Sequence, residues 1–471
     1  MTFTSPEFVI FFAVFVPLYF LIPPRFRWVL LLIASYFFYA YGSGIYVLLI
    51  ITTTLIDYTA ARLMGRTSAS HPRKLLLAAS LTANLGTLFI FKYFNFFNQS
   101  LSSVLGYPAS PLNVILPVGI SFYTFQSMAY TIDVYRGLVE PETHLGLFAT
   151  FVAFFPQLVA GPIERAKHML PQFHRPVRFD QERAVEGLRL ILWGAFKKIV
   201  IADRLAIYVN TVYNAPGSYS GLPLIIATIF FAFQIYGDFS AYSDIAIGTA
   251  KILGFDLMLN FRQPYFAQSV REFWARWHIS LSTWFRDYLY IPLGGNRVPF
   301  ARHLLNLMIV FVVSGLWHGA SWTFVIWGAL HGLYIVVENV LSHRGIEFKV
   351  PAILKIAITF GLVTFAWIFF RANSFSDALY VVTHLFAFTG QSLTDPFASG
   401  LLGAHVEFAL SCGLIALLVG VDVLIERSGF DAILKARPLA LRWIAYYVAG
   451  AAVIFSGLYG TGAQIFIYFR F

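Results

Sequence analysis

The feature that most constrains this chain is a series of long apolar segments that recurs from one end to the other. One helical crossing of a bilayer requires about 20 mainly apolar residues. Candidate spans lie near residues 8–22, 28–41, 45–61, 75–97, 115–132, 145–160, 187–208, 221–237, 303–318, 321–341, 353–370, 402–424 and 442–459. Because several are short or polar, the sequence predicts roughly ten to twelve spanning helices, with other segments re-entrant or interfacial.

The composition of the 471-residue chain agrees with a membrane protein. Apolar side chains make up 58% of it and charged side chains 12%, about half the charged fraction of an ordinary soluble protein. A soluble fold has no use for so much apolar surface, whereas lipid can cover it. No long segment of soluble composition interrupts the pattern. The sequence therefore predicts an all-α, polytopic membrane protein with one domain over residues 1–471.

The charged residues predict an orientation in the bilayer. The net charge of +10 is divided among short clusters between apolar segments, which argues against a nucleic-acid partner and fits the positive-inside rule. Arg25 and Arg27 follow the first span, four cations lie within 62–74, and 98–114 has no charge. This alternation predicts an outside N-terminus and a cytoplasmic 62–74 loop. The charged segment 164–186 is expected to be a cytoplasmic loop or surface helix.

Several kinds of chemistry are disfavoured by motifs that the chain lacks. Its single cysteine, Cys412, excludes an internal disulfide and a metal site built from clustered cysteines. The sequence has no H-E-x-x-H zinc motif, no Walker loop and no G-x-S-x-G nucleophile elbow. We therefore expect no metal site and no bound cofactor.

The segment 260–302 is too polar to span a membrane and too aromatic for an ordinary loop. At helical spacing, one apolar stripe consists of Phe273, Trp277, Leu281, Trp284 and Tyr288. A second stripe consists of Arg271, Trp274, His278, Ser282 and Phe285. This pattern predicts an interfacial or re-entrant helix, with one side against protein or lipid and the other toward a polar cavity.

Histidines in apolar surroundings are functional candidates, because ionisable groups are costly at membrane depth. His318 lies between the apolar runs 304–313 and 322–330, although it could also be a hydrogen-bonded core histidine. His331 lies 13 positions further on and would face elsewhere unless the helix breaks between them, so we expect it to be structural. His278 is the second candidate, and its alternative is an interfacial histidine that faces water or headgroups.

Other polar residues within apolar segments form a third group of candidates. They are Gln126, Asp133, Gln234, Asp238, Ser240 and Asp244. Such residues could line a cavity or cap a broken helix. Hydrogen bonding between helices is the favoured interpretation for them.

Several motifs together resemble one known family. They are residues 155–162, the stretch from Tyr236-Gly237-Asp238-Phe239-Ser240 to Ile247-Gly248, the block 260–297, Trp317-His318-Gly319, Phe369-Phe370-Arg371-Ala372 and Phe466-Ile467-Tyr468-Phe469. The chain thereby resembles the membrane-bound O-acyltransferase (MBOAT) family, most of all its bacterial alginate O-acetylation branch. The resemblance implies helices around a central funnel or tunnel, with the active-site core at about 120–340.

The resemblance also implies roles for particular residues. His318 matches the catalytic histidine of the family, and His278 matches its second active-site histidine. A neutral imidazole can take the proton from an alcohol as its oxygen attacks a thioester carbonyl. The candidates to bind substrate or line the tunnel are Trp317, Trp274, Ser282, Arg286, Asp287, Asn260, Gln234 and Asp238.

The expected function is that of a multi-pass O-acyltransferase in the bacterial cytoplasmic (inner) membrane. It would take an acetyl group from a cytosolic thioester such as acetyl-CoA. A periplasmic acetyltransferase partner would pass the group to hydroxyls of an exported or cell-wall polysaccharide, for which alginate, cellulose, peptidoglycan and teichoic acid stay open. The alternatives are a transporter without covalent chemistry, which would show paired half-sequence repeats, and a structural subunit of a polysaccharide export complex.

Overall fold

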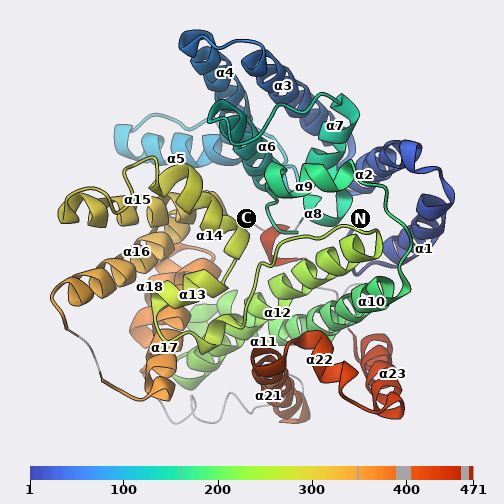
Figure 1. The fold of residues 1–471 in the computed structure, drawn as a ribbon. Coiled ribbons are helices and arrows are strands. Elements are labelled where there is room, and N and C mark those ends of the chain that lie inside the picture. The colour runs from blue at the N-terminus through green and yellow to red at the C-terminus, as the bar shows by residue number, and fades with distance from the viewer. Residues whose placement is uncertain (160, 347–348, 389–404, 458–465, 470–471) are drawn as a thin grey trace. The chain divides into compact units, whose positions relative to one another are not determined.

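The computed structural model describes residues 1–471 except 160, 347–348, 389–404, 458–465 and 470–471. Within this described part every regular element is helical (Figure 1), which confirms the all-α prediction. Eight continuous helical stretches are long and apolar enough to cross a membrane. They are Pro24–Gly65, Ser70–Leu105, Leu222–Ile252, Phe300–His318, Trp322–His343, Ala352–Arg371, His405–Ser428 and Leu439–Ser456. The polytopic fold is thereby confirmed.

Four of the other predicted spans take shorter or interrupted forms. The segment 115–132 contributes to a helix of only 16 residues, Ile120–Tyr135. The segment 187–208 is interrupted by the π-helical segment Phe196–Ala202. Pro6–Leu21 and Leu145–Leu158 are apolar but short. The length of an apolar run therefore overstates the length of regular helix in these places.

The chain forms two compact units. The first comprises residues 1–191 and 242–259, and the second comprises 192–241 and 260–471. A single membrane domain over residues 1–471, with a funnel or tunnel at its centre, stays a prediction. All ten residues proposed from the sequence for the site lie in the second unit.

The first unit contains the N-terminal helices. They are α1 (Pro6–Leu21), α2 (Arg27–Ser43), α3 (Val47–Gly65), α4 (Ser70–Leu88), α5 (Phe94–Leu105), α6 (Ile120–Tyr135), α7 (Leu145–Ala153), α8 (Phe155–Leu158), α9 (Ala166–Phe173) and most of α10 (Gln181–Ala195). α3, α4 and α6 pack against one another. At their centre the buried Asp57 of α3 accepts hydrogen bonds from Ser80 and Asn84 of α4 and from Ser127 of α6. Polar groups buried among apolar helices need such partners.

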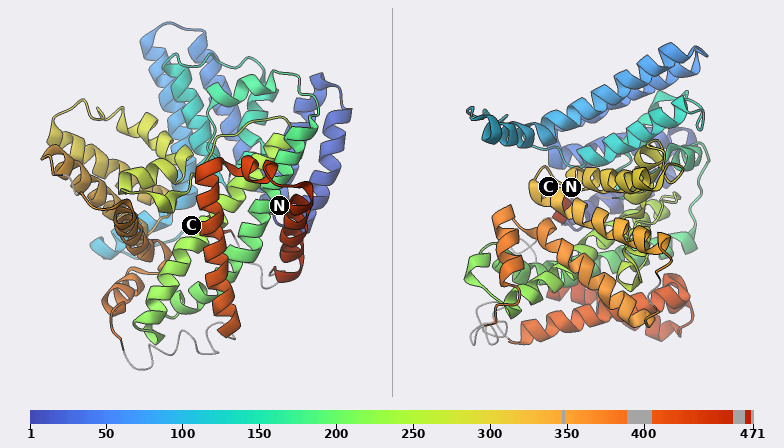
Figure 2. Two further views of the ribbon diagram at one scale, coloured as in Figure 1. Left: turned by 60° about the horizontal axis from the view of Figure 1, so that its bottom comes forward. Right: turned by 90° about the vertical axis from the view of Figure 1, so that its left-hand side faces the viewer.

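The second unit carries the candidate site. Its helices are α11 (Asp203–Tyr213), most of α12 (Leu222–Ile252), α13 (Val270–Arg276), α14 (Ile279–Phe285), α15 (Phe300–His318), α16 (Trp322–His343), α17 (Ala352–Arg371), α18 (Phe375–His384), α21 (His405–Ser428), α22 (Phe430–Lys435) and α23 (Leu439–Ser456). The last turns of α12 belong to the first unit. α15 and α16 lie side by side (Figures 1 and 2).

Two glycines bring the backbones of α15 and α16 unusually close together. A Cβ atom at Gly315 would lie 2.3 Å from the carbonyl oxygen of Phe324. A Cβ atom at Gly328 would lie 2.3 Å from the carbonyl oxygen of Phe311. Small residues at helix contacts are a common means of packing helices in membranes. This contact fixes the helix that carries His318.

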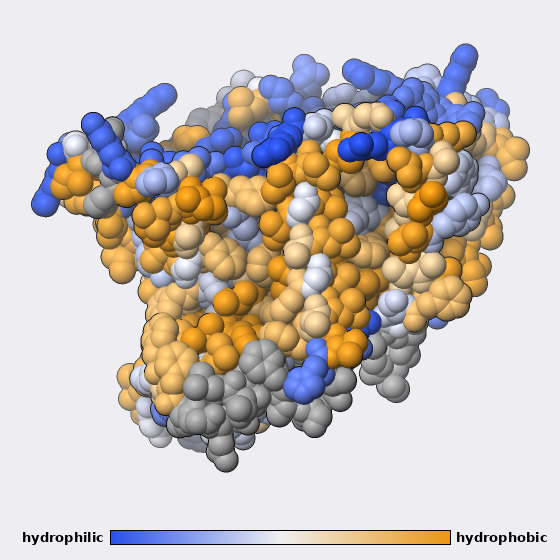
Figure 3. All heavy atoms as spheres, turned by 90° about the horizontal axis from the view of Figure 1, so that it is seen from below, coloured by the Kyte–Doolittle hydropathy of each residue, from blue (hydrophilic) through white to orange (hydrophobic). Residues whose placement is uncertain are grey.

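The outer surface is suited to lipid. Apolar side chains make up much of the surface drawn in Figure 3. Leu21 of α1 is 79% exposed, Ile353 of α17 is 73% exposed and Phe455 of α23 is 84% exposed. Apolar helices with so much exposed apolar surface require a nonaqueous cover, which a bilayer provides.

Candidate functional site

His318 stands at the end of a helix. α15 ends at His318, the backbone is extended at Gly319, and α16 begins at Trp322 with Ser321 as its N-cap. A Cβ atom at Gly319 would lie 2.2 Å from the ring of Phe324, so glycine is needed there for close packing. The helix therefore breaks between His318 and His331, which is the condition under which the argument that they face different ways does not apply.

His278 stands at a second break. α13 ends at Arg276 and α14 begins at Ile279, and His278 between them has a φ of +43°. The single helix expected for this block is therefore wrong. A positive φ is strained for a residue with a side chain and costs about 1–3 kcal/mol. Strain of this kind is concentrated at functional sites.

Asn260 holds the turn that places His278. The carbonyl oxygen of Asn260 accepts a hydrogen bond of 2.9 Å from the N–H of Ile279. Its side-chain oxygen accepts a hydrogen bond of 2.6 Å from the hydroxyl of Ser280. Asn260 thus supports the backbone on the C-terminal side of His278, which is a positioning role.

The two breaks bring His278 and His318 together, as the sequence led us to expect of two site residues. Their ring centroids are 6.3 Å apart, and their exposed fractions are 0% and 2%. The alternative in which His278 faces water or headgroups is therefore wrong. Burial lowers the pKa of His278, which lies outside the eight spanning stretches, to about 3. Its imidazole is neutral at pH 7.

Aromatic rings surround both histidines. Phe239 of α12 lies 4.6 Å from His278, and Phe370 of α17 lies 5.5 Å from His318, measured between ring centroids. The ring of Trp317 lies 5.0 Å from His318 and 6.1 Å from His278. These rings exclude water from the imidazoles and keep their surroundings apolar.

Tyr468 is a site residue that the sequence reasoning did not single out. Its ring centroid lies 5.7 Å from that of His318, 6.1 Å from that of His278 and 4.3 Å from that of Phe239. The signal available in the sequence was its aromatic motif, Phe466-Ile467-Tyr468-Phe469. No spacing rule could connect this motif with histidines 150 or more positions earlier.

Asp238 anchors the segment that carries Tyr468. Its Oδ2 accepts a hydrogen bond of 2.8 Å from the N–H of Ile467. The Nζ of buried Lys198 lies 2.9 Å from Asp238 Oδ1 and 2.7 Å from Asp203 Oδ1. A buried carboxylate requires such a cation and donor. Asp238 therefore serves the site by fixing Tyr468.

His331 belongs to the same aromatic cluster, although it lies near the middle of α16 and not at a helix end. Trp327 lies 4.9 Å from His318 on one side and 4.9 Å from His331 on the other, between ring centroids. The indole N–H of Trp274 donates to His331 Nδ1 at 3.2 Å. This contact supports the expected structural role of His331, which stays a prediction.

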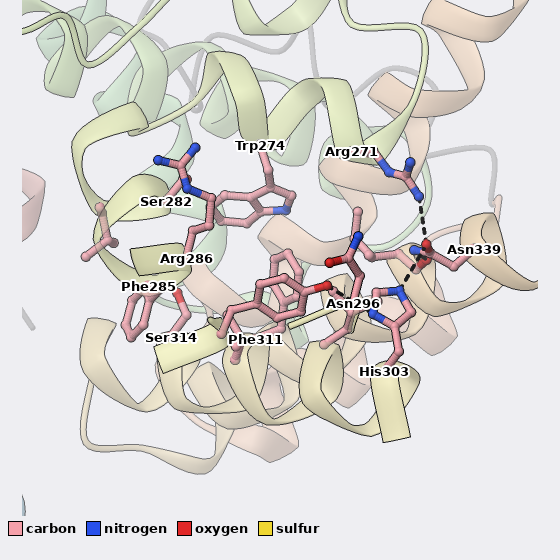
Figure 4. Close-up of a pocket in the computed structure, with 15 residues that line it drawn as sticks. Arg271, Trp274, Ser282, Phe285, Arg286, Asn296, His303, Phe311, Ser314 and Asn339 are labelled. Carbon is pink, nitrogen blue, oxygen red and sulfur yellow. Dashed lines mark hydrogen bonds between the residues drawn. The ribbon is translucent and has the colours of Figure 1, made fainter. Parts of the chain in front are cut away.

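A cavity of about 490 Å³ lies in the second unit and is lined by residues of α13, α14, α15 and α16 and of the segment 286–296 (Figure 4). Trp274, Ser282 and Arg286, all expected to line a tunnel, line this cavity. Ser314 also lines it and lies one helical turn before His318 on α15. The cavity therefore approaches His318 to within one turn of its helix.

The cavity combines apolar walls with cationic and polar groups. In Figure 4 the ring of Trp274 is drawn between the guanidinium groups of Arg271 and Arg286. Arg271 Nη2 donates to Asn339 Oδ1 at 2.8 Å. Arg286 pairs at 2.8 Å with Asp287, whose carboxylate is partly exposed. Two arginines over an aromatic wall can bind a ligand with both a phosphate and an apolar part.

Two of the remaining polar candidates make hydrogen bonds between elements of the fold. In the first unit the Gln126 amide donates to the carbonyl of Phe151 at 2.8 Å. In the second unit Ser240 accepts a hydrogen bond of 2.7 Å from Lys197. These contacts agree with the favoured interpretation of hydrogen bonding between helices. Gln234 is buried on α12, and its side-chain oxygen has no hydrogen-bond partner among the described residues.

Comparison with known proteins gives consistent matches. A model of the membrane-bound O-acyltransferase family matches residues 142–376, which include both histidines. The chain is 40% identical over 431 residues to the probable alginate O-acetylase AlgI of Pseudomonas aeruginosa, covering 89% of this chain and 82% of the relative. It is 37% identical over 398 residues to the peptidoglycan O-acetyltransferase of Helicobacter pylori, covering 79% and 76%. It is 26% identical over 284 residues to the teichoic acid D-alanyltransferase of Bacillus subtilis, covering 56% and 71%.

Proposed function

Because the chain belongs to the membrane-bound O-acyltransferase family, and is thus an O-acyltransferase, we propose that it transfers an acetyl group from a thioester, with His318 as general base. The observation that carries this proposal is the meeting of two buried histidines at two helix breaks, with ring centroids 6.3 Å apart. The test is transfer of labelled acetate from acetyl-CoA by membranes that contain the chain and its acceptor pathway. Transfer equal to that of membranes without the chain would overturn the proposal.

The chemical step is an acyl transfer that balances without a further reagent. His318 takes the proton of the attacking hydroxyl, whose oxygen forms a C–O bond with the thioester carbonyl carbon. The C–S bond then breaks, and the thiolate recovers the proton from the imidazolium. Neutral His278 lies near enough to orient the reacting groups. The surrounding rings exclude water, which would otherwise hydrolyse the thioester.

The proposed donor is acetyl-CoA or another thioester on a phosphate-bearing carrier. The cavity of about 490 Å³ has the size of a small-molecule site. Arg271 and Arg286 supply cations for phosphate, and Trp274 and Phe311 supply apolar walls. Ser314 places the inner part of the cavity near His318. These features together support a donor with a charged end and an apolar arm.

Replacing both arginines of the cavity should weaken donor binding and leave the chemical step largely intact. We expect Arg271→Gln/Arg286→Gln to raise KM for acetyl-CoA by about tenfold or more, because charged hydrogen bonds to phosphate are lost. The value of kcat should change much less. Arg302→Gln is the matched control, because Arg302 is exposed and does not line the cavity. An unchanged KM in the double variant would remove both arginines from the donor site.

The proposed acceptor is the hydroxyl of an exported or cell-wall polysaccharide. Relatives named for alginate and for peptidoglycan support a polymer of this class. A periplasmic acetyltransferase partner would complete the transfer on the outer face of the bacterial inner membrane. The acetyl group would then cross from the cytosolic to the periplasmic side.

This direction of transfer requires a defined orientation of the chain, with its N-terminus outside. In a Cys412→Ala background, a cysteine at Ser68 should be protected from a membrane-impermeant maleimide in whole cells. A cysteine at Ser110 should react. The reason is that cations cluster in the 62–74 loop and are absent from 98–114. The reverse labelling pattern at both positions would overturn the orientation.

A further inference from the structure

A basic pocket of about 620 Å³ lies in the first unit. Its charged side chains are Lys167, Arg175, Arg178 and Arg183 against Asp180 and Asp256, four cations and two anions, which gives +2 with His168 neutral. None of the residues assigned to acyl transfer lines it. The pocket therefore has a charge suited to an anionic ligand, and the proposed site of acyl transfer does not include it.

Three of the four cationic side chains have no hydrogen bond or ion pair within the described residues. Arg183 donates to Asp256 Oδ1 at 3.0 Å and to the carbonyl of Lys251 at 3.1 Å. The side chains of Lys167, Arg175 and Arg178 are exposed and make no hydrogen bond or ion pair within the described ranges. Structural ion pairing accounts for Arg183, but it does not account for the other three cations.

The pocket is held in shape by contacts between its two walls. Gln172 Nε2 donates to the carbonyl of Asp256 at 3.0 Å, and the N–H of Asp256 donates to Gln172 Oε1 at 2.8 Å. Gly254 has a φ of +90°, and a Cβ atom there would lie 2.1 Å from Val177. The segment around Val177 is thus fixed against the turn after α12. Such preorganisation lowers the entropic cost of binding a ligand.

The same segment lies at the end of an apolar helix. Arg27, at the start of α2, donates to the carbonyl of Val177, and the rings of Phe20 and Phe179 lie 5.3 Å apart. Leu21 is 79% exposed and Phe179 is 56% exposed. Exposed apolar and aromatic residues directly beside arginines are typical of the level at which a helix leaves the hydrocarbon region.

We infer that this pocket binds the headgroup of an anionic phospholipid. Lys167, Arg175 and Arg178 contact the phosphate, and Phe179 lies among the adjoining acyl chains. Basic pockets beside membrane helices bind anionic headgroups through the same attraction. A lipid fits better than a soluble phosphate compound, because only a lipid has acyl chains that also cover the exposed ring of Phe179 and the exposed side chain of Leu21.

The test compares lipids that share acyl chains and differ in headgroup charge. Native mass spectrometry of the purified full chain measures retention of phosphatidylglycerol and phosphatidylcholine. We expect wild-type protein to retain phosphatidylglycerol at least about tenfold more strongly, and Arg175→Gln/Arg178→Gln to lose this preference. The control is Arg66→Gln/Lys74→Gln, which removes two exposed cations from the same unit without touching the pocket.

Three results would overturn the inference. The first is equal retention of both lipids by wild-type protein. The second is an equal loss of preference in the Arg66→Gln/Lys74→Gln control, which would mean that overall charge, and not the pocket, decides retention. The third is displacement of phosphatidylglycerol by glycerol 3-phosphate or 3′-phospho-ADP at similar concentration, which would assign the pocket to a soluble phosphate compound. Thermal unfolding of each variant in detergent checks that it is folded.

Discussion

Replacing His318 with glutamine is expected to lower the rate of acyl transfer by at least about 10²-fold, since general-base catalysis contributes about 10²- to 10⁴-fold. Glutamine keeps hydrogen-bonding capacity and most of the volume of histidine, but it cannot accept a proton at pH 7. His318→Ala should lose as much. KM for acetyl-CoA should change little, because the imidazole acts mainly in the transition state. The measurement is transfer of labelled acetate at equal protein level.

Two other histidines provide controls for this result. His343→Gln, at the exposed end of α16, should transfer at the wild-type rate. His331→Ala should lose less than His318→Gln, because the ring of Trp327 lies between His331 and His318. A wild-type rate in His318→Gln would refute its role as base. Complete loss in His331→Ala with activity kept in His318→Gln would move the base to His331.

Replacing His278 with glycine is expected to lower transfer by about 10²-fold while the protein stays folded. Glycine adopts the positive φ of this position without strain. The free energy of strain that is removed should therefore offset part of the packing energy that is lost with the imidazole ring. Stability in detergent should therefore exceed that of His278→Ala. This pair of variants separates a role in the reaction from a role in the turn.

Gln263→Gly is the matched control for this backbone effect. Among the non-glycine residues of the described part of the chain, only His278 and Gln263 have a positive φ. The φ of Gln263 is +38°. Its replacement should relieve strain of the same kind and leave transfer unchanged. Wild-type transfer by His278→Gly, at equal protein level, would mean that His278 serves only to shape the turn between α13 and α14.

Much of the helical fold, and the choice of His318 as a candidate, could be predicted from the sequence, because both depend on hydrophobicity. Apolar runs identify spanning helices. A histidine in such a run is easily noticed, because placing an ionisable side chain at membrane depth costs free energy. The stripe of Phe273, Trp277, Leu281 and Trp284 was also informative, because all four side chains are buried. These inferences use only local pattern, and local pattern was sufficient for them.

The helix break at His278 and the contribution of Tyr468 depend on interactions that local pattern does not contain. One inverted φ at His278 interrupts the helix, yet the apolar spacing continues across it. The break after His318 falls between the predicted spans 303–318 and 321–341, and the packing of Gly319 against Phe324 stabilises it. Tyr468 reaches the histidines because Asp238 binds the backbone of Ile467, 229 positions away. Each of these features is decided by tertiary contact.

The close packing of α15 on α16 has a consequence for acyl-chain length. Phe311 contributes its ring to the wall of the proposed donor cavity, while its carbonyl faces Gly328 at the helix contact. Its backbone has no room to retreat toward α16, so this wall cannot move outward to admit a longer chain. Admitting butyryl or longer donors would then require shortening side chains that line the cavity, such as those of Phe311 or Trp274. If the cavity holds the acyl chain of the donor, the glycine contact thus leaves chain-length selectivity to the side chains that line it and not to movement of the α15 backbone.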